Sequence, residues 1–256
     1  MRYYTVSDVH GNYTLLRKIL DKMGFFNDKK PHKLLMNGDL LDRGQEANQL
    51  IDFMIDLMEK DMLIFVLGNH EELLIQCLQE LARGSVSEHH DLNGTWNTLL
   101  QISEMNENEA YANPNELIRR VIDSPLYKQL LTICVDYYET PNYIFTHGWI
   151  PCFIQGYGPY VKYTYNPDWR NADIDSWRCA RRHNGMELAC KYHVVEPDKT
   201  IVCGHWNTSF GHARINKHGT EWGADANFSP FYADGIIAID GSTYNSKKMN
   251  CIIIDD

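Results

Sequence analysis

Three apolar, strand-like runs near the start of the chain each end in polar side chains, and this recurrence constrains the fold more than any other feature. The runs are "RYYTVSD", "KLLMNGD" and "MLIFVLGNHE", which deliver Asp8, Asp39 and Asn69 at spacings of 31 and 30 residues. One βαβ unit needs about that length. The pattern therefore predicts parallel strands covered by helices, with these three side chains at one edge of the sheet.

The segments between and after these runs have helical periodicity. "NYTLLRKILDKMG", "QEANQLIDFMIDLMEK" and "ELLIQCLQELARG" each carry one apolar stripe. Residues 89–136 are expected to be mostly helical, and Pro114 marks a helix start there. Later runs, "NYIFTHGWI", "KTIVCGH", "GIIAIDGS" and "MNCIIIDD", predict more strands. We expect a single domain over 1–256, with a helical insertion around 89–136 and a long loop around 206–235.

Composition excludes several function classes. The net charge of −10 and the pI near 5.5 argue against extended nucleic-acid binding, although a small phosphorylated ligand needs only a local positive site. The seven cysteines are scattered and never form a Cys-x-x-Cys pair, which favours a reducing, cytoplasmic setting. No apolar stretch is long enough to span a bilayer, so no membrane association is expected.

The polar strand ends predict a metal centre. The side chains expected to converge are Asp8, His10, Asp39, Asn69, His147 and His205. Carboxylate, amide and imidazole ligands without a thiolate suit manganese, iron or zinc. Six ligands are too many for one catalytic ion with open positions, but they suit two divalent ions that share a carboxylate. Asp39 is central in order and is the expected bridge. Each residue alone would be read as a turn or surface residue, whereas their joint order at strand ends favours the metal site.

Five short motifs, in order, resemble a known family. "SDVHG", "GDLLDRG", "GNHE", "THG" and "CGH" are similar to the signatures of the calcineurin-like metallophosphoesterases, and most similar to the phosphoprotein phosphatase superfamily with its bacterial and phage members. The resemblance covers most of the chain, and "IIAIDGSTYNSKKMNCIIIDD" resembles the closing strand pair of that family. It implies an α/β fold in which two mixed sheets pack together between helices, an αββα sandwich.

The resemblance also implies roles for the site residues. One ion would be held by Asp8, His10 and Asp39. The other would be held by Asp39, Asn69, His147 and His205, with manganese the first choice of metal.

Phosphate oxygens would be held by Arg43, Asn69 and a second arginine, for which Arg178 is the first choice and Arg181 and Arg182 are rivals. His70 would protonate the leaving oxygen, and Asp42 would orient His70.

Two segments depart from the family pattern. Ser7 stands where the first motif usually has glycine. The stretch after His205, "WNTSFGHARINKHGTEWGADANFSPFYADG", does not match the short continuation common in the family. Its aromatic residues would either stack on a substrate base or pin the loop to the body, and pinning is the more common role.

Three functions follow as expectations. The leading one is a dinuclear-metal phosphomonoesterase acting on phosphorylated proteins as a serine/threonine phosphatase. The alternative is a diadenosine polyphosphate or other nucleotide hydrolase of the same superfamily. A non-catalytic module that binds a phosphorylated ligand is a third option. The presence of Arg43 and His70 speaks against it, because a binder needs no acid for a leaving group.

Overall fold

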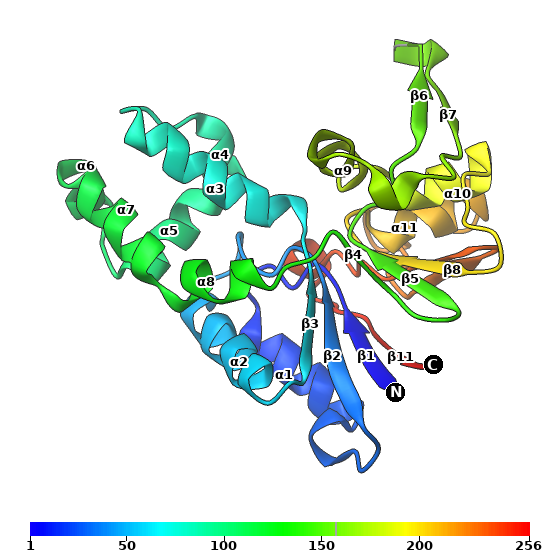
Figure 1. The fold of residues 1–256 in the computed structure, drawn as a ribbon, viewed down its shortest axis with the longest axis horizontal. Helices are drawn as coiled ribbons and strands as arrows, with labels where there is room; N and C mark the ends of the chain where they lie inside the picture. Colours follow the sequence, from blue (N-terminus) through cyan, green and yellow to red (C-terminus); the bar gives the residue numbers. More distant parts are fainter. Residues whose placement is uncertain (157) are drawn as a thin grey trace.

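The structure is a computed structural model that describes residues 1–156 and 158–256. Its first sheet has the strand order β11-β1-β2-β3 (Figure 1). Strands β1, β2 and β3 run parallel, and β11 runs antiparallel to β1. The strands of this sheet are β1 (Arg2–Val6), β2 (His32–Asn37), β3 (Leu63–Val66) and β11 (Cys251–Asp255).

A second sheet has the strand order β4-β5-β8-β10-β9. Its three central strands are parallel, and both edge strands are antiparallel to their neighbours. The strands are β4 (Tyr137–Glu139), β5 (Tyr143–Thr146), β8 (Thr200–Cys203), β10 (Ile236–Ala238) and β9 (Phe231–Ala233). The expected strands are therefore present, and they are divided between two sheets.

The last two strands do not form the pair that the sequence suggested. Strand β10 lies in the second sheet and β11 lies in the first, with the short helix α12 (Thr243–Ser246) in their connection. Ile239, just after β10, and Ile254 in β11 both contribute to the apolar layer between the sheets. The connection thus carries the chain from one sheet to the other.

Alternation of side chains along the strands builds three apolar layers. In the first sheet, Tyr4 and Leu34 face the helical side, while Tyr3 and Leu35 face the second sheet. Phe145 and Val202 of the second sheet complete the layer between the sheets. The outer face of the second sheet packs against its own helices. The expected αββα sandwich is confirmed.

Two sets of helices cover the outer faces of the sheets (Figure 1). The first set comprises α1 (Tyr13–Lys22), α2 (Ala47–Glu59), α3 (Asn69–Ala82), α4 (Glu88–Leu92), α5 (Thr95–Ser103), α6 (Glu107–Ala112), α7 (Pro114–Asp123) and α8 (Pro125–Lys128). The second set comprises α9 (Ile174–Ala180), α10 (Gly185–Tyr192) and the short α11 (Thr208–Phe210).

The two segments singled out from the sequence differ in character. Helices α4 to α8 occupy most of residues 89–136, and Pro114 is the first residue of α7, as expected. Residues 206–235 are not a loop throughout, because they include α11, a π-helical turn at Gly211–Ile215 and β9. Sequence reasoning also missed a separate hairpin of β6 (Phe153–Gln155) and β7 (Lys162–Thr164), which projects from the body (Figure 1).

Among the described residues, no helix is both long enough and apolar enough to cross a membrane.

Candidate functional site

The polar residues at the strand ends occupy an unusual backbone conformation. Six of them have φ values between 48° and 69°, the left-handed region that non-glycine residues seldom adopt. Such strain persists where the surrounding structure determines it, and it clusters at functional sites. The residues are Asp8, His10, Asp39, Asp42, Arg43 and His205.

Two glycines allow the site to close. A Cβ atom on Gly38, whose φ is +82°, would lie 2.4 Å from Nδ1 of His147. A Cβ atom on Gly68 would lie 2.3 Å from a carboxylate oxygen of Asp39. Neither position has room for a side chain, so glycine lets three strand ends approach one another.

One group of side chains surrounds Oδ1 of Asp39. Nε2 of His147 lies 3.2 Å from this oxygen and 3.1 Å from Oδ1 of Asn69. The rings of His147 and His205 are 5.1 Å apart. Asp39, His147 and His205 each offer an atom within 4.8 Å of the others, a spacing that could hold a metal ion.

A second group surrounds Oδ2 of the same aspartate. Nε2 atoms of His10 and His70 both lie 3.8 Å from Oδ2 of Asp39, and these three residues also have the spacing of a metal site. Oδ1 of Asp8 is 4.0 Å from Nε2 of His10. The two carboxylate oxygens of Asp39 therefore face two different groups, as the bridge predicted from the sequence should.

The imidazole rings present defined atoms to these groups. Nδ1 of His10 is 3.1 Å from the Leu41 carbonyl oxygen, and Nδ1 of His147 is 2.9 Å from the Asn37 carbonyl oxygen. A carbonyl oxygen only accepts, so each Nδ1 carries the proton and donates it. Nε2 of each ring is then the atom left to bind a metal ion in place of a proton, which is the usual arrangement around a protein-bound metal.

Ser7, the departure in the first motif, holds the predicted ligand Asp8 in place. Its hydroxyl lies within hydrogen-bond reach of Oδ2 of Asp8 and of the Asn37 carbonyl oxygen. The backbone N–H of His205 donates to the same oxygen of Asp8 at 3.0 Å. Asp8 thus keeps Oδ1 toward His10, and the serine supports the carboxylate rather than displacing it.

The electrostatics of the site favour a positive charge beside Asp39. Burial would raise the pKa of Asp39, but His147 and His70 hold it well below the usual range. Burial would lower the pKa of His147, but Asp39 raises it to about 10. Burial lowers the pKa of His205 to about 3, so this ring is neutral. A buried carboxylate that draws a proton onto its neighbour fits a cation-binding position.

The predicted acid and its orienting partner are in contact. Nδ1 of His70 lies 2.7 Å from Oδ2 of Asp42, which also accepts a hydrogen bond from the Thr95 hydroxyl at 2.7 Å. Burial lowers the pKa of His70, but Asp39 and Asp42 outweigh it and raise that pKa overall. A buried histidine that retains its proton has the charge state of a general acid.

Arg43 directs its guanidinium into the same site. Nη1 donates to Nε2 of His10 at 3.1 Å, and Nη2 lies 3.2 Å from Nε2 of His70. The two donors of one planar fork thus point at the His10 and His70 group. That geometry suits two oxygens of one phosphoryl group.

The three candidate arginines after Trp177 share one carboxylate. Glu72 lies 2.6 Å from Nη2 of Arg181, 3.4 Å from Nε of Arg178 and 3.2 Å from Nη2 of Arg182. Arg181 is buried and also binds Asp136 at 2.6 Å, so both sides of its fork are engaged.

Arg178 and Arg182 remain partly exposed, with 41% and 39% of their side chains accessible. The segment lies beside the centre, because Trp149, two residues after His147, donates its backbone N–H to the Ala180 carbonyl at 3.0 Å.

Sequence reasoning missed Glu71, the last residue of "GNHE". Its buried carboxylate accepts hydrogen bonds from the backbone N–H groups of Gly68, Asp39 and Leu40 at 2.8, 3.1 and 2.9 Å. Burial and the nearby Asp39 raise its pKa to about 7. Glu71 therefore ties the second strand end to the third. The motif could have pointed to Glu71, because this glutamate was its only polar residue without an assigned role.

The aromatic residues after His205 divide between the two roles considered. Phe231 is fully buried and Phe228 is 9% exposed, so both pin the segment to the body. Trp206 and Trp222 are 36% and 54% exposed. The ring of Trp206 lies 6.4 Å from that of His205, so it stands beside the candidate site with part of its surface free.

The donor set fits two divalent cations. The imidazole Nε2 atoms, the two oxygens of the Asp39 carboxylate and the absence of thiolates among the described site residues match borderline ions such as manganese, iron or zinc. Residues Asp8, His10, Asp39, Asn69, His147 and His205, widely separated in sequence, all lie in this cluster.

The chain is similar to known proteins. The profile of the calcineurin-like phosphoesterase family matches residues 1–231. A symmetrical bis(5'-nucleosyl)-tetraphosphatase of Buchnera aphidicola is 41% identical over 75 residues, which cover 29% of this chain and 26% of that protein. An asymmetrical bis(5'-nucleosyl)-tetraphosphatase of Oceanobacillus iheyensis is 27% identical over 157 residues, which cover 59% of this chain and 57% of that protein. The chain thus spans a quarter to just over half of the length of these relatives.

The fold also matches a solved structure. A protein described as a candidate diadenosine tetraphosphatase superposes with a TM-score of 0.50 at 13% identity, covering 99% of this chain and 89% of that one. At that identity the likeness concerns the fold alone. The family profile carries the assignment, and the chain belongs to the calcineurin-like phosphoesterases, hydrolases that act on phosphoester bonds.

Proposed function

We propose that this chain hydrolyses nucleoside polyphosphates of the diadenosine tetraphosphate class, at a pair of divalent cations bridged by Asp39. The observation that carries the proposal is the division of the Asp39 carboxylate between two ligand groups. The two relatives described above are bis(5'-nucleosyl)-tetraphosphatases, which supports the choice of a nucleotide substrate.

In this proposal the protein holds the ions through fixed donors. Asp8, His10 and Asp39 hold one ion, and Asp39, Asn69, His147 and His205 hold the other. When bound, two such cations supply Lewis acidity toward phosphate oxygens and lower the pKa of water.

The remaining site residues act on the phosphoryl group. The Arg43 fork binds two of its oxygens, and Asn69, whose Oδ1 lies 3.1 Å from Nε2 of His147, contacts the phosphoryl group from the other ligand group. His70 gives its Nε2 proton to the leaving oxygen, and Asp42 fixes the ring by accepting from Nδ1 at 2.7 Å. Arg178, partly exposed and held near the centre by Glu72, binds a further phosphate oxygen.

Trp206 is the residue best placed to favour a nucleotide. Its ring is partly exposed beside His205, and stacking on an aromatic ring contributes about 1–3 kcal/mol per base. A phosphoserine peptide has no base to stack. Trp206 would therefore raise affinity for a dinucleotide without changing the chemistry at phosphorus.

The serine/threonine phosphatase activity expected from the sequence is the second candidate. Asp42, Arg43 and His70 engage only the phosphoryl group and the leaving oxygen, which a phosphoprotein shares with a nucleotide. The difference between the two substrates lies beyond the reacting atoms, in contacts such as Trp206.

One comparison tests the proposal. Hydrolysis of diadenosine tetraphosphate and of a phosphoserine peptide is measured with the same Mn²⁺ concentration. We expect kcat/KM to be at least tenfold higher for the dinucleotide, and Trp206→Ala to raise KM for it while leaving 4-nitrophenyl phosphate hydrolysis unchanged. Products distinguish cleavage to two ADP from cleavage to ATP and AMP. A preference for the peptide would overturn the substrate assignment. If none of the three substrates is hydrolysed, the assignment of an enzymatic activity is overturned.

A further inference from the structure

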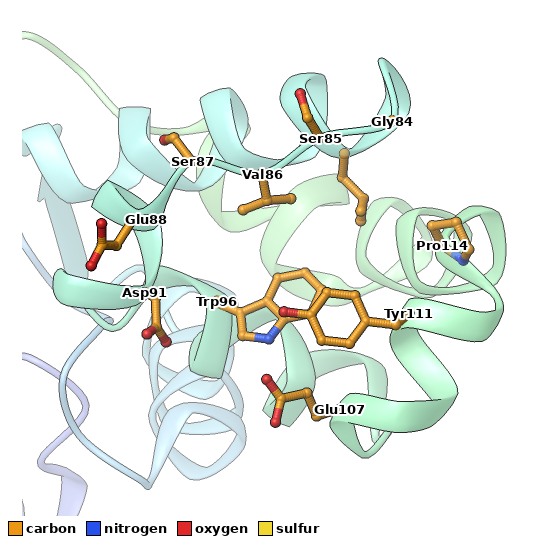
Figure 2. A pocket seen from close by; sticks show the side chains of 11 residues that line it. Gly84, Ser85, Val86, Ser87, Glu88, Asp91, Trp96, Glu107, Tyr111 and Pro114 are labelled. Carbon is orange, nitrogen blue, oxygen red and sulfur yellow. The ribbon is translucent and has the colours of Figure 1, made fainter.

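A pocket far from the metal-ligand cluster lies within the helical insertion. It is a cavity of about 420 Å³ bounded by the end of α3 and by α4, α5 and α6 (Figure 2). Helix α3 begins at Asn69 in the cluster and reaches the pocket at Leu81. A helix of this length extends about 20 Å, so the pocket does not share reacting atoms with the phosphoesterase site.

An aromatic pair forms one wall of the pocket. The rings of Trp96 and Tyr111 stack with centroids 5.2 Å apart and planes inclined by 27° (Figure 2). Trp96 is 4% exposed, whereas Tyr111 is 63% exposed. A large, fixed π-surface is thus held open to a ligand, and such surfaces attract cations, with arginine the most frequent partner.

Three carboxylates surround this wall. Glu88, Asp91 and Glu107 line the pocket. Within the described part of the chain none of the three has an ion-pair or side-chain hydrogen-bond partner, whereas nearby Glu80 pairs with His90 and Ser87. Three unpaired acids beside an aromatic face repel phosphate and attract a cation. The pocket therefore suits a ligand of the opposite charge to the substrate of the metal centre.

The Trp96 indole adds a requirement that a simple cation does not meet. Its Nε1–H is buried and has no hydrogen-bond partner, and the ring edge that carries it faces Glu107 in the pocket (Figure 2). A buried donor without an acceptor is costly, so a matching ligand should bring an acceptor. A ligand that matches the pocket therefore carries a planar cation and a nearby carbonyl group in one molecule.

We propose that this pocket binds an arginine residue of a peptide. The guanidinium stacks on Tyr111 and pairs with the carboxylates, and a backbone carbonyl of the peptide accepts from Nε1 of Trp96. Arginine combines a planar face with a fixed fork of donors, which an aromatic and acidic pocket uses together. The volume is within the range of ligand pockets and exceeds what one side chain fills, which leaves room for flanking backbone.

The Trp96 indole N–H gives a direct measurement. The full chain, labelled with ¹⁵N, is titrated with the blocked tripeptide acetyl-Gly-Arg-Gly-amide, and the indole resonance of Trp96 is assigned with Trp96→Phe. We expect a saturable shift of that resonance. The matching citrulline peptide, which is neutral and nearly isosteric, should bind at least tenfold more weakly. Agmatine, which has the guanidinium without a peptide carbonyl, should also bind more weakly.

Variants that remove one charge but keep the shape of the side chain should fold normally, so a loss of binding in them is not a loss of folding. Asp91→Asn and Glu107→Gln should each weaken the arginine peptide up to about fivefold, the scale of an exposed ion pair. Glu59→Gln, at an exposed residue of α2, is the matched control and should leave binding unchanged. All three should hydrolyse phosphoesters at the wild-type rate, so failure here is distinguishable from failure of the metal centre. Equal binding of the citrulline peptide, equal binding of agmatine, or no saturable shift would each overturn the proposal.

Discussion

The contact between His70 and Asp42 shows how single residues set the proposed chemistry. His70 is 3% exposed, and burial alone would strip its proton, yet Asp39 and Asp42 raise its pKa. Asp42 in turn is held by the Thr95 hydroxyl, and its backbone N–H donates to Thr98 at 3.1 Å. Both threonines belong to the helical insertion, so α5 supports the acid from outside the motif residues.

His70→Asn should lower kcat most where the leaving group needs a proton. We expect a loss of about 100-fold or more on phenyl phosphate, and a clearly smaller loss on 4-nitrophenyl phosphate, whose leaving group departs without protonation. Steady-state kinetics with both esters measures the difference, and Asp42→Asn should show the same trend with a smaller loss. His218→Asn, an exposed histidine, is the control. Equal losses on the two esters would contradict the role of acid.

For single residues, the sequence predicted membership of the site wherever the residue belonged to a recognisable motif. Asp8, His10, Asp39, Asn69, His147 and His205 gather in one cluster, although their roles as ligands stay predictions. Arg181 could not be separated from Arg178 in the sequence, because its burial depends on Glu72 and Asp136 from distant elements. Glu71 was missed because its partners are backbone amides, which carry no sequence signature.

Helix boundaries and edge strands are decided by tertiary contacts. Helix α3 begins at Asn69 rather than within "ELLIQCLQELARG", because Glu71 accepts the Gly68 N–H and starts the helix inside the motif. The β6–β7 hairpin was not foreseen, since β6 is exposed along its length and has no alternating pattern. The βαβ periodicity of the first hundred residues, in contrast, reflects real burial and was predictable.

The edge strand β4 supports a prediction at the scale of elements. Arg170 binds Glu139 of β4 through two donors, and Lys199 lies 2.8 Å from the same carboxylate. The hydrogen bonds from Arg170 lower the pKa of Glu139 to about 2, from the ordinary value of 4.5. Because the folded-state pKa is the lower one, this contribution to stability is complete above about pH 4.5 and is lost as the pH falls toward 2.

Glu139→Gln should therefore reduce the free energy of unfolding at pH 7 by about 1 kcal/mol and by much less near pH 2. Urea denaturation at several pH values measures this difference. Glu59→Gln, with no ion-pair partner among the described residues, should show no such pH dependence. A Glu139→Gln effect that is constant from pH 7 to pH 2 would contradict the assignment.

The two sheets act as one structure because polar and apolar contacts join them. Asn37, at the end of β2, is fully buried and donates to the Thr146 and Val202 carbonyls of the second sheet at 2.8 and 3.1 Å. The apolar layer around Phe145 lies between the same sheets. Sequence periodicity predicted the strands but not this division, because partners such as β1 and β11 lie at opposite ends of the chain.

Asn37→Ala should remove both hydrogen bonds by which β2 holds the second sheet. We expect a loss of about 2–4 kcal/mol in the free energy of unfolding, measured with urea, and one transition by both near- and far-ultraviolet circular dichroism. Asn27→Ala, at an exposed asparagine, is the control. A loss below about 0.5 kcal/mol, or separate transitions by the two probes, would show that the sheets unfold independently.

The central claim is that one carboxylate, Asp39, joins two cation sites. The most direct measurement is the number of Mn²⁺ ions bound per chain, by elemental analysis after dialysis, in the wild type and in two variants. We expect two ions in the wild type, about one in Asp8→Asn, and fewer than one in Asp39→Asn, because losing the shared ligand weakens both sites. One ion in the wild type, or two ions retained in Asp39→Asn, would contradict the account.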